Sequence, residues 1–404
     1  MKDTLHYIRT LCRFVLLGLL VGLVCGAVGT VFYHAIALAT RLQTGHPWLL
    51  YLLPVAGLLT AYLYALLKME KDPGTDAVLR ATKDAQTVPA RLAALIFSGT
   101  FLTHLCGGSA GREGAALQIG GGLGTAISRL LKLSEGETKL VTMCGMSAVF
   151  SAVFGTPLTA AVFSIEVASV GMISSTAMLP CAISSLTAAY IARLLGAAGE
   201  AYALEGVPAL NLQSLLPALL LGLICALVSI LFCEVMHASR RLFGRWFSNR
   251  YVRVTVGAVL VVGASLLLGT GRYNGAGADV IAQAIEEGRA LPYDGIVKLL
   301  LTAITLGCGM KGGEIVPAFF VGSTMGCLLG PLVGLSPSFG AALCMVGLFC
   351  GVVNCPIASI LLSMELFGGA GLPLFALIAA VSFACSGRHS LYSAQSFVFD
   401  KASV

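Results

Sequence analysis

The sequence contains very little charge. Aspartate, glutamate, lysine and arginine together make up 11% of its 404 residues, whereas hydrophobic residues make up 57%. Soluble globular proteins carry about a quarter charged residues, so the composition excludes a soluble fold and predicts an integral membrane protein. Apolar segments run from Phe14 to Phe383 and no polar body follows a short leader. We therefore expect no cleaved signal and no separate soluble domain.

The sequence also lacks the motifs of several enzyme and metal-binding classes. Neither H-E-x-x-H nor a paired aspartate is present, which argues against an intramembrane enzyme. The 13 cysteines form no C-x-x-C motif and no cluster with histidine, and most lie in apolar runs, as Cys25 and Cys144 do. Buried free cysteine packs as a small hydrophobic residue. We therefore expect no disulfide, no metal site and no cofactor.

The chain does contain an internal repeat. The stretch 22–32 (GLVCGAVGTVF) matches 222–232 (GLICALVSILF), and three further sets of residues match in the same order at offsets of 199 to 203 residues. These sets pair Gly74, Thr75 and Asp76 with Gly277, Ala278 and Asp279; Gly111, Gly120 and Gly124 with Gly313, Gly322 and Gly326; and Pro157, Ser164 and Glu166 with Pro356, Ser363 and Glu365. Four matches in order indicate two homologous halves, 1–205 and 206–404.

Loop charges indicate that the two halves are inserted in opposite orientations. The loop at 41–48 carries one arginine, whereas its counterpart at 240–253 carries five. Basic loops stay on the cytoplasmic side, so equivalent loops lie on opposite faces and the repeat is inverted, as in many secondary transporters. Lys2, Arg9 and Arg13 precede the first span and place the N-terminus in the cytoplasm. The net charge of +6 thus indicates membrane orientation and contact of the 240–253 arginines with anionic lipid, not nucleic-acid binding.

Segment lengths predict a mixture of complete spans and half-helices. Crossing about 30 Å of hydrocarbon takes roughly 20 apolar residues, and few segments are long enough: 14–38, 49–67, 215–236 and 252–268. Other apolar segments are short and interrupted by glycine or proline: 115–131, 158–170, 315–329 and 357–367. Half-helices that end inside the bilayer leave N–H groups free, which is tolerated where they line a polar cavity or bind a ligand. The predicted fold class is an all-α polytopic membrane protein, an inverted repeat with broken and re-entrant helices.

The segment 107–120, GGSAGREGAALQIG, places two full charges inside an apolar region. Its glycines allow a sharp turn and a close approach to a ligand. A helix that begins near Glu113 would direct its N-terminal N–H groups, and the positive end of its dipole, toward the membrane interior, which favours anion binding. Arg112 is expected to hold neighbouring carbonyls or to assist access of the anion. An Arg112–Glu113 ion pair is the alternative, although adjacent residues usually point apart.

The equivalent helix of the second half begins at 312–317 (GGEIVP), with Pro317 in its first turn. In an inverted repeat the two helix starts converge from opposite faces, which predicts one anion site near the midplane, built largely from backbone. Glu113 beside this site is itself an anion: when deprotonated it occupies the site, and when protonated it releases it. Proton binding and anion binding become alternatives at one place, as exchange of an anion for H⁺ requires.

At these residues the sequence resembles the CLC family of chloride channels and anion/proton antiporters, over essentially the whole chain. The segment 111–114 (GREG) is similar to the family's G-R-E-G-P motif, and 313–317 (GEIVP) occupies the place of its G-x-F-x-P. The segments 156–166 and 356–365 are similar to family segments as well. The resemblance implies a homodimer with a separate pore in each subunit, each subunit being built from inverted halves.

Where the chain departs from the chloride-selective members, it is similar to one branch of the family. Those members carry G-S-G-I-P, whose serine coordinates the halide, where this chain has GTDAV at 74–78. Ala115 replaces the proline after G-R-E-G, and Val167 stands where chloride antiporters have a second glutamate. With these departures the chain resembles the bacterial fluoride/proton antiporters, which keep the gating glutamate and lose the serine. Thr75 differs from the better-known members of that branch, which place Met or Asn there.

The resemblance to this branch also implies residue roles. Its members have a glutamate matching Glu314 in proton and ion handling, a phenylalanine matching Phe320 with its ring edge toward fluoride, and a tyrosine matching Tyr392 near the pathway. Fluoride is small and strongly hydrated, so close donors, supplemented by an electropositive ring edge, must replace its water. The candidate site thus comprises the gating residue Glu113 and the anion-binding residues Gly111, Arg112, Thr75, Glu314, Ile315, Val316, Phe320 and Tyr392.

Several polar and aromatic residues also have a structural interpretation. Glu314 and Asp76 would each cap the helix that starts beside them. Phe320 would be a core aromatic residue. Glu166 and Glu365, which are equivalent in the repeat, lie at the ends of apolar helices and would serve as partners for N–H groups.

Together these observations predict a homodimeric fluoride/proton antiporter in the bacterial plasma membrane. Its partners would be fluoride, protons and the lipid bilayer. An exchanger or channel for chloride or another anion on the same fold is the first alternative. An intramembrane enzyme is the second, in which loss of Glu113 would abolish hydrolysis instead of uncoupling transport. Whether Thr75 contacts the ion is left open.

Overall fold

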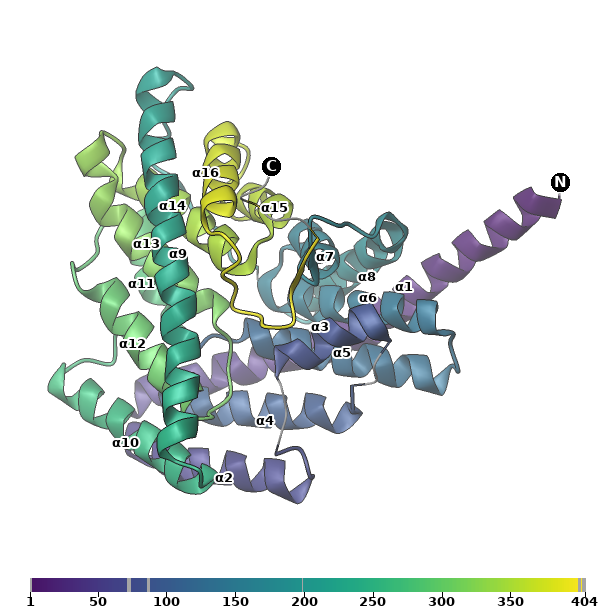
Figure 1. Cartoon of the computed structure of the whole chain (residues 1–404), viewed down its shortest axis with the longest axis horizontal. Coiled ribbons are helices and arrows are strands. Elements are labelled where there is room, and N and C mark those ends of the chain that lie inside the picture. Colours follow the sequence, from purple (N-terminus) through teal and green to yellow (C-terminus); the bar gives the residue numbers. More distant parts are fainter. Residues whose placement is uncertain (1, 71–73, 86–87, 198, 399–400, 402–404) are drawn as a thin grey trace.

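The computed structural model is predominantly helical, and it describes residues 2–70, 74–85, 88–197, 199–398 and 401 (Figure 1). The first half contains α1 (Lys2–Gly45), the 3₁₀ helix η1 (Pro47–Leu52), α2 (Leu53–Leu66), α3 (Thr75–Asp84), α4 (Ala90–Leu105), α5 (Glu113–Leu130), α6 (Glu135–Phe154), α7 (Pro157–Glu166) and α8 (Ser175–Leu194). The second half contains α9 (Leu212–Trp246), α10 (Arg250–Leu267), α11 (Ala278–Glu286), α12 (Asp294–Gly307), α13 (Ile315–Leu329), the 3₁₀ helix η2 (Pro331–Val333), α14 (Pro337–Val353), α15 (Pro356–Phe367) and α16 (Leu372–Cys385). Two short strands, β1 (Ser169–Val170) and β2 (Ser396–Phe397), pair in parallel, a small addition to the predicted all-α fold.

Within the described residues, five helical stretches are long and apolar enough to cross a membrane. Four of them fall on the predicted spans: α1, the joined η1 and α2, α9 and α10. The fifth, α8, is absent from the sequence-based prediction because its serine and threonine residues dilute its apolar character. Helices α7, α13 and α15 are shorter and coincide with three of the predicted half-helices. The side chain of Lys2, one of the three basic residues expected ahead of the first span, lies outside the described part.

The two halves repeat the same order of helices and the same packing. Helix α5 packs on α6 as α13 packs on α14, and α1 packs on α8 as α9 packs on α16. In Figure 1 most of the first half, from purple to blue, lies toward the right and the bottom, and most of the second half, from teal to yellow, lies toward the left and the top. The boundary predicted at residues 205 and 206 falls in the connection between α8 and α9, and it remains a prediction.

The glycines that recur in both halves lie where the backbones of two helices are in contact. A Cβ atom added at Gly124 of α5 would lie 2.6 Å from the carbonyl oxygen of Val141 in α6. A Cβ at Gly322 of α13 would lie 2.7 Å from the carbonyl oxygen of Cys344 in α14. Each pair of helices therefore packs backbone to backbone, as small residues allow inside a membrane.

Equivalent helices of the two halves also pack against one another, α2 on α10 and α7 on α15. At the contact between α7 and α15, each half supplies a carboxylate that accepts hydrogen bonds from the other half. Glu166, at the end of α7, accepts hydrogen bonds from two N–H groups in the first turn of α15 (3.1 and 2.9 Å). Glu365 of α15 accepts from two N–H groups in the first turn of α7 (both 2.8 Å). The prediction that both glutamates are partners for N–H groups is confirmed.

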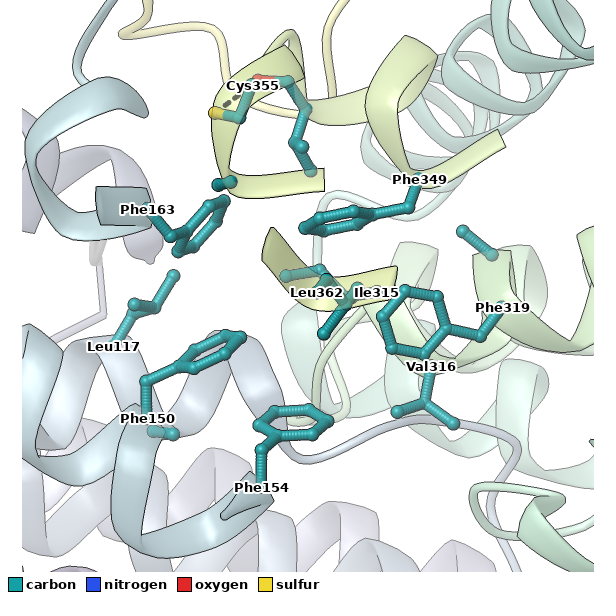
Figure 2. Packing of buried hydrophobic residues seen from close by; sticks show 14 of the residues in the cluster. Leu117, Phe150, Phe154, Phe163, Ile315, Val316, Phe319, Phe349, Cys355 and Leu362 are labelled. Carbon is teal, nitrogen blue, oxygen red and sulfur yellow. Dashed lines mark hydrogen bonds between the residues drawn. The ribbon is translucent and has the colours of Figure 1, made fainter. Parts of the chain in front are cut away.

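A row of aromatic rings crosses from one half to the other beside the starts of α5 and α13 (Figure 2). Phe154 and Phe150 of α6 stack at 4.5 Å between ring centroids, and Phe150 lies 5.2 Å from Phe163 of α7. Phe163 then meets Phe349 of α14 at 5.9 Å, and Phe349 meets Phe319 of α13 at 5.3 Å. These contacts fix the relative position of the helices that carry the site.

The cysteines behave as packing residues. All 13 are free, and all except Cys12 and Cys385 are buried. The expectation that those in apolar runs pack as small hydrophobic residues is confirmed.

The exchanged carboxylates predict a specific loss of stability. In Glu166→Ala, two N–H groups at the start of α15 lose their acceptor inside the protein, which costs about 1–3 kcal/mol per group left unpaired. Thermal unfolding in detergent should show a lower Tm for this variant. Glu135→Ala, which removes an exposed carboxylate from the first turn of α6, is the control. Equal Tm values for the two variants would contradict the capping role.

Candidate functional site

The chain approaches α5 through a tight turn that pairs with its counterpart in the other half. Gly107 has φ +72°, a conformation that glycine adopts without strain. Gly111 and Gly313 then exchange two backbone hydrogen bonds, Gly111 N–H to Gly313 O at 2.8 Å and Gly313 N–H to Gly111 O at 2.7 Å. This antiparallel bridge brings the starts of α5 and α13 together. The two halves of the chain therefore meet at the two glycine-rich motifs identified in the sequence.

Glu113 is held between the two helix starts. It is the first residue of α5 and its side chain is fully buried. Its Oε2 atom accepts hydrogen bonds from the N–H groups of Arg112 (3.0 Å) and Val316 (3.2 Å). Val316 is the second residue of α13, so amides at the starts of both helices hold one carboxylate oxygen. Such amides, at the positive ends of two helix dipoles, form a site that suits a small anion.

The other oxygen of Glu113, Oε1, is buried and has no hydrogen-bond partner among the described residues. A buried polar atom without a partner is destabilising. The carboxylate is thus secured through one oxygen only, which makes it a replaceable occupant of the amide site.

Arg112 contributes to this site through its backbone and not through its side chain. Its guanidinium forms an ion pair with Glu200 at 2.7 Å and lies 5.1 Å from the ring centroid of Tyr33. The expectation that Arg112 holds neighbouring carbonyls is therefore wrong, and so is the alternative of an Arg112–Glu113 ion pair. Glu200 lies in the connection between the halves and can face the Arg112 guanidinium directly. The side chain of the adjacent Glu113 cannot, because adjacent residues usually point apart.

A cavity of about 400 Å³ approaches the helix starts from one side. Thr75, Glu314 and Tyr392 line it, together with Gly114 and Gly313. Glu113 is not among the lining residues. Thr75, the first residue of α3, accepts a hydrogen bond from Gln118 Nε2 of α5 at 3.2 Å. Three of the candidate residues thus gather around one cavity, and Glu113 lies behind its glycine wall.

Glu314 does not cap the helix that it precedes. It occupies the N-cap position of α13 but makes no capping hydrogen bond with its side chain, because its carboxylate forms an ion pair with Arg240 of α9. The expectation of a capping role is wrong. Arg240, Arg250 and Arg253 line the cavity, so part of the arginine cluster that we expected at lipid head groups faces this site instead.

The C-terminal segment places Tyr392 at the cavity. Asp76, in the first turn of α3, accepts a hydrogen bond from the Ala394 N–H through Oδ1 (3.0 Å). Strand β2 pairs with β1 directly after this contact. Asp76 therefore anchors the segment that carries Tyr392, and this hydrogen bond joins its side chain to the C-terminal segment and not to the start of α3.

Phe320 packs in the interior of the protein. It is fully buried one turn after Val316 in α13, and its ring centroid is 6.2 Å from that of Tyr273. It is not one of the residues that line the cavity. Ile315, the first residue of α13, is also fully buried. The candidate residues thus fall into a cavity group, a backbone group around Glu113 and a deeper group that includes Phe320.

Sequence reasoning missed two polar residues of this region. Gln118 bonds Thr75 and lines the cavity. Lys298 of α12 is fully buried and lies 5.3 Å from the ring centroid of Phe320. A signal for Lys298 existed, because it is a single lysine within an apolar segment, and intramembrane ionisable residues are rare.

Comparisons with known proteins agree with this arrangement. Residues 56–387 match the family model described as voltage gated chloride channel. The chain is 32% identical over 400 residues to the chloride/fluoride channel protein of Pseudomonas syringae pv. tomato, covering 97% of this chain and 88% of that protein. It is 26% identical over 391 residues to the H(+)/Cl(-) exchange transporter ClcA of Vibrio cholerae, covering 87% and 81%.

Solved structures share the fold. The crystal structure of a CLC-type fluoride/proton antiporter superposes with a TM-score of 0.92 at 32% identity, covering 96% of this chain and 98% of that chain. A slow cyanobacterial Cl⁻/H⁺ antiporter superposes with a TM-score of 0.78 at 19% identity, covering 93% and 94%, which shows a common fold. By its sequence match and its inverted, re-entrant helical architecture, the chain belongs to the voltage gated chloride channel (CLC) family.

Proposed function

We propose that this protein exports fluoride in exchange for protons. The observation that carries the proposal is the Glu113 carboxylate, which accepts a hydrogen bond from an amide at the start of each of two converging helices. A relative at 32% identity is a chloride/fluoride channel protein, and a structural neighbour at the same identity is a fluoride/proton antiporter. Both support fluoride as the anion.

In this mechanism Glu113 and fluoride use the same amides in turn. Protonation removes the negative charge of Glu113 and weakens its hydrogen bonds to Arg112 and Val316, because bonds to an ionised acceptor are the stronger ones. The side chain then leaves and fluoride takes its place. When Glu113 releases its proton, the carboxylate returns and displaces the anion. Proton binding and fluoride binding therefore alternate at one place, as exchange requires.

Fluoride would reach this site through the cavity lined by Thr75, Glu314 and Tyr392. Arg240, Arg250 and Arg253 at the same cavity are expected to attract anions toward it. If basic loops are cytoplasmic, this cavity opens to the cytoplasm. Neutral HF enters cells under acid conditions and dissociates there, so proton influx coupled to fluoride efflux would remove it.

The wider assignment follows from the same family resemblance. We propose that the protein is a homodimer with one pathway in each subunit, inserted in the lipid bilayer of the bacterial plasma membrane with its N-terminus in the cytoplasm. It acts as a transporter and not as an enzyme. We place Gly111, Ile315 and Phe320 in the anion pathway together with the residues named above, Gly111 through its backbone and Phe320 through its ring edge.

Chloride transport on the same fold is the competing function, since a relative at 26% identity is an H(+)/Cl(-) exchange transporter. Fluxes from proteoliposomes, measured for each anion with and without a pH gradient, separate the two. We expect fluoride efflux to drive proton uptake, and chloride to drive none. A chloride flux equal in size to the fluoride flux would overturn the proposal.

The carboxylate mechanism predicts loss of coupling in Glu113→Gln. The amide of glutamine is neutral at every pH used, so it cannot carry a proton or return as an anion. Fluoride efflux from proteoliposomes should then take up no protons. Glu287→Gln, at the exposed end of α11, is the matched control and should keep wild-type coupling. Normal proton uptake in Glu113→Gln would refute the mechanism.

A further inference from the structure

Lys298 is a buried charged residue that the exchange mechanism above does not use. It lies in α12, one turn after Asp294, and both side chains are fully buried. Ionised side chains are costly inside a membrane protein, and they are usually paired or functional. Asp294 and Lys298 differ in how their charges are balanced.

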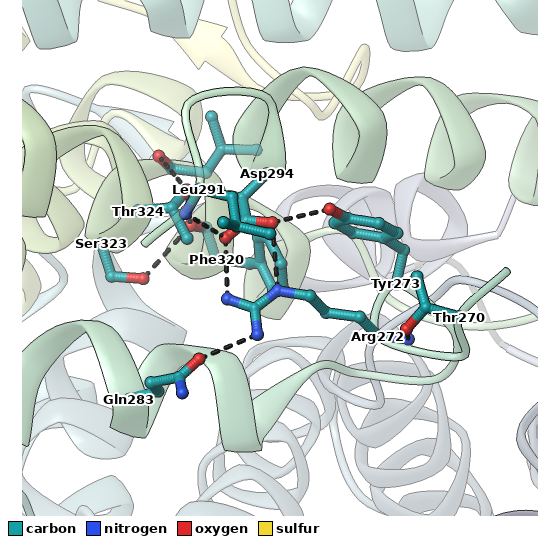
Figure 3. A network of polar contacts seen from close by, with 10 residues as sticks. Thr270, Arg272, Tyr273, Gln283, Leu291, Asp294, Phe320, Ser323 and Thr324 are labelled. Atoms are coloured by element: carbon teal, nitrogen blue, oxygen red, sulfur yellow. Dashed lines mark hydrogen bonds and ion pairs between the residues drawn. The ribbon is translucent and has the colours of Figure 1, made fainter. Parts of the chain in front are cut away.

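Asp294 is fully paired (Figure 3). Its carboxylate receives two hydrogen bonds from the guanidinium of Arg272 (3.1 and 2.8 Å) and one from the Tyr273 hydroxyl (2.7 Å). The Leu291 N–H donates a fourth (2.9 Å). Asp294 is therefore balanced by Arg272 and has no charge left to offset Lys298.

Lys298 has no such counter-ion. Its Nζ donates to the carbonyl oxygens of Tyr273 (3.0 Å) and Gly275 (2.7 Å), and no carboxylate of the described residues lies within ion-pair distance of it. The ring centroid of Phe320 lies 5.3 Å from Nζ. Gly277 makes this approach possible, since a Cβ there would meet the Phe320 ring at 2.6 Å and lie 3.4 Å from Nζ.

These contacts connect Lys298 to the helix starts on both sides. Phe320 is one turn after Val316, the α13 residue whose N–H binds Glu113. The carbonyl of Gly275 also accepts from Ala110 N–H (3.1 Å), and Gly275 N–H donates to Gly108 O (3.0 Å), in the turn that leads into α5. The lysine is thus built into the support of the anion site.

We propose that Lys298 is the fixed counter-charge of the anion site. Its positive charge is balanced in turn by the deprotonated Glu113 carboxylate and by the transported anion. A site that holds neither would leave the lysine uncompensated, so the empty state is disfavoured and the two anions must alternate. This proposal rests on the proposed function and adds a residue that sets anion affinity.

Three substitutions separate the charge of Lys298 from its hydrogen bonds. Lys298→Gln keeps N–H donors for the two carbonyls but has no charge, whereas Lys298→Arg keeps both. Tyr273→Phe removes one anchor of the same loop and leaves the lysine intact. Each variant is first checked for a wild-type elution profile and Tm in detergent. The KM for fluoride and the pH profile of exchange are then measured in proteoliposomes.

We expect the KM for fluoride in Lys298→Gln to rise roughly tenfold, the change expected for loss of one favourable charge contact. Lys298→Arg and Tyr273→Phe should stay within about twofold of wild type on the same scale. A wild-type KM and pH profile in Lys298→Gln would show that the residue is only a hydrogen-bonding anchor. An equal rise in Tyr273→Phe would show that loop position, and not charge, sets the affinity.

If Lys298→Gln does not fold, Lys298→Met replaces it, since methionine places no polar atom in the core. A wild-type KM in Lys298→Met would then overturn the proposal. Wild-type protein measured alongside tells the two proposals apart. If wild type exchanges no fluoride, the proposed function fails. If wild type exchanges fluoride and the uncharged variants match it, only the role of Lys298 fails.

Discussion

One carboxylate oxygen, bonded to amides at the starts of two helices that come from different halves of the chain, organises this molecule. Glu113 Oε2 receives the N–H groups of Arg112 and Val316, and the backbone bridge between Gly111 and Gly313 brings those amides together. Helix starts are intrinsically anion-seeking because their first N–H groups lack partners within the helix. An acidic side chain satisfies them most strongly while it is ionised. The site is therefore filled by a carboxylate or by another anion, and protonation decides which.

The rest of the fold fixes the positions of the two helix starts relative to each other. Recurring glycines let α5 lie against α6 and α13 against α14 at backbone contact. The carboxylates of Glu166 and Glu365 tie α7 to α15 in a reciprocal way, and the aromatic row from Phe154 to Phe319 fills the space beside the site. These contacts are internal to the protein and do not require the anion. The amide site is thus preorganised, so little reorganisation is needed when one occupant replaces the other.

Much of the architecture could be predicted from the sequence, because it is written in patterns that depend on local chemistry. Low charge indicated the membrane, a nearly constant offset indicated the repeat, and glycine-rich helix starts indicated the convergence at Glu113. Side-chain partners between distant segments could not be predicted. Arg112 turns to Glu200 and Glu314 turns to Arg240, although sequence reasoning assigned each a local role. Such pairs join residues that are far apart in the sequence, and no sequence motif specifies which residues pair. The hydrogen bond from Lys298 to the loop at Gly275 could not be predicted for the same reason.

The account makes Glu113 and fluoride mutually exclusive, so binding of the anion must change the protonation of the protein. Calorimetric titration of fluoride into the wild-type protein, in two buffers of different ionisation enthalpy at the same pH, measures that change directly. The account predicts net proton uptake on fluoride binding wherever Glu113 starts ionised, seen as a binding enthalpy that differs between the buffers. Saturable fluoride binding with the same enthalpy in both buffers would mean that the anion and the carboxylate do not share a site.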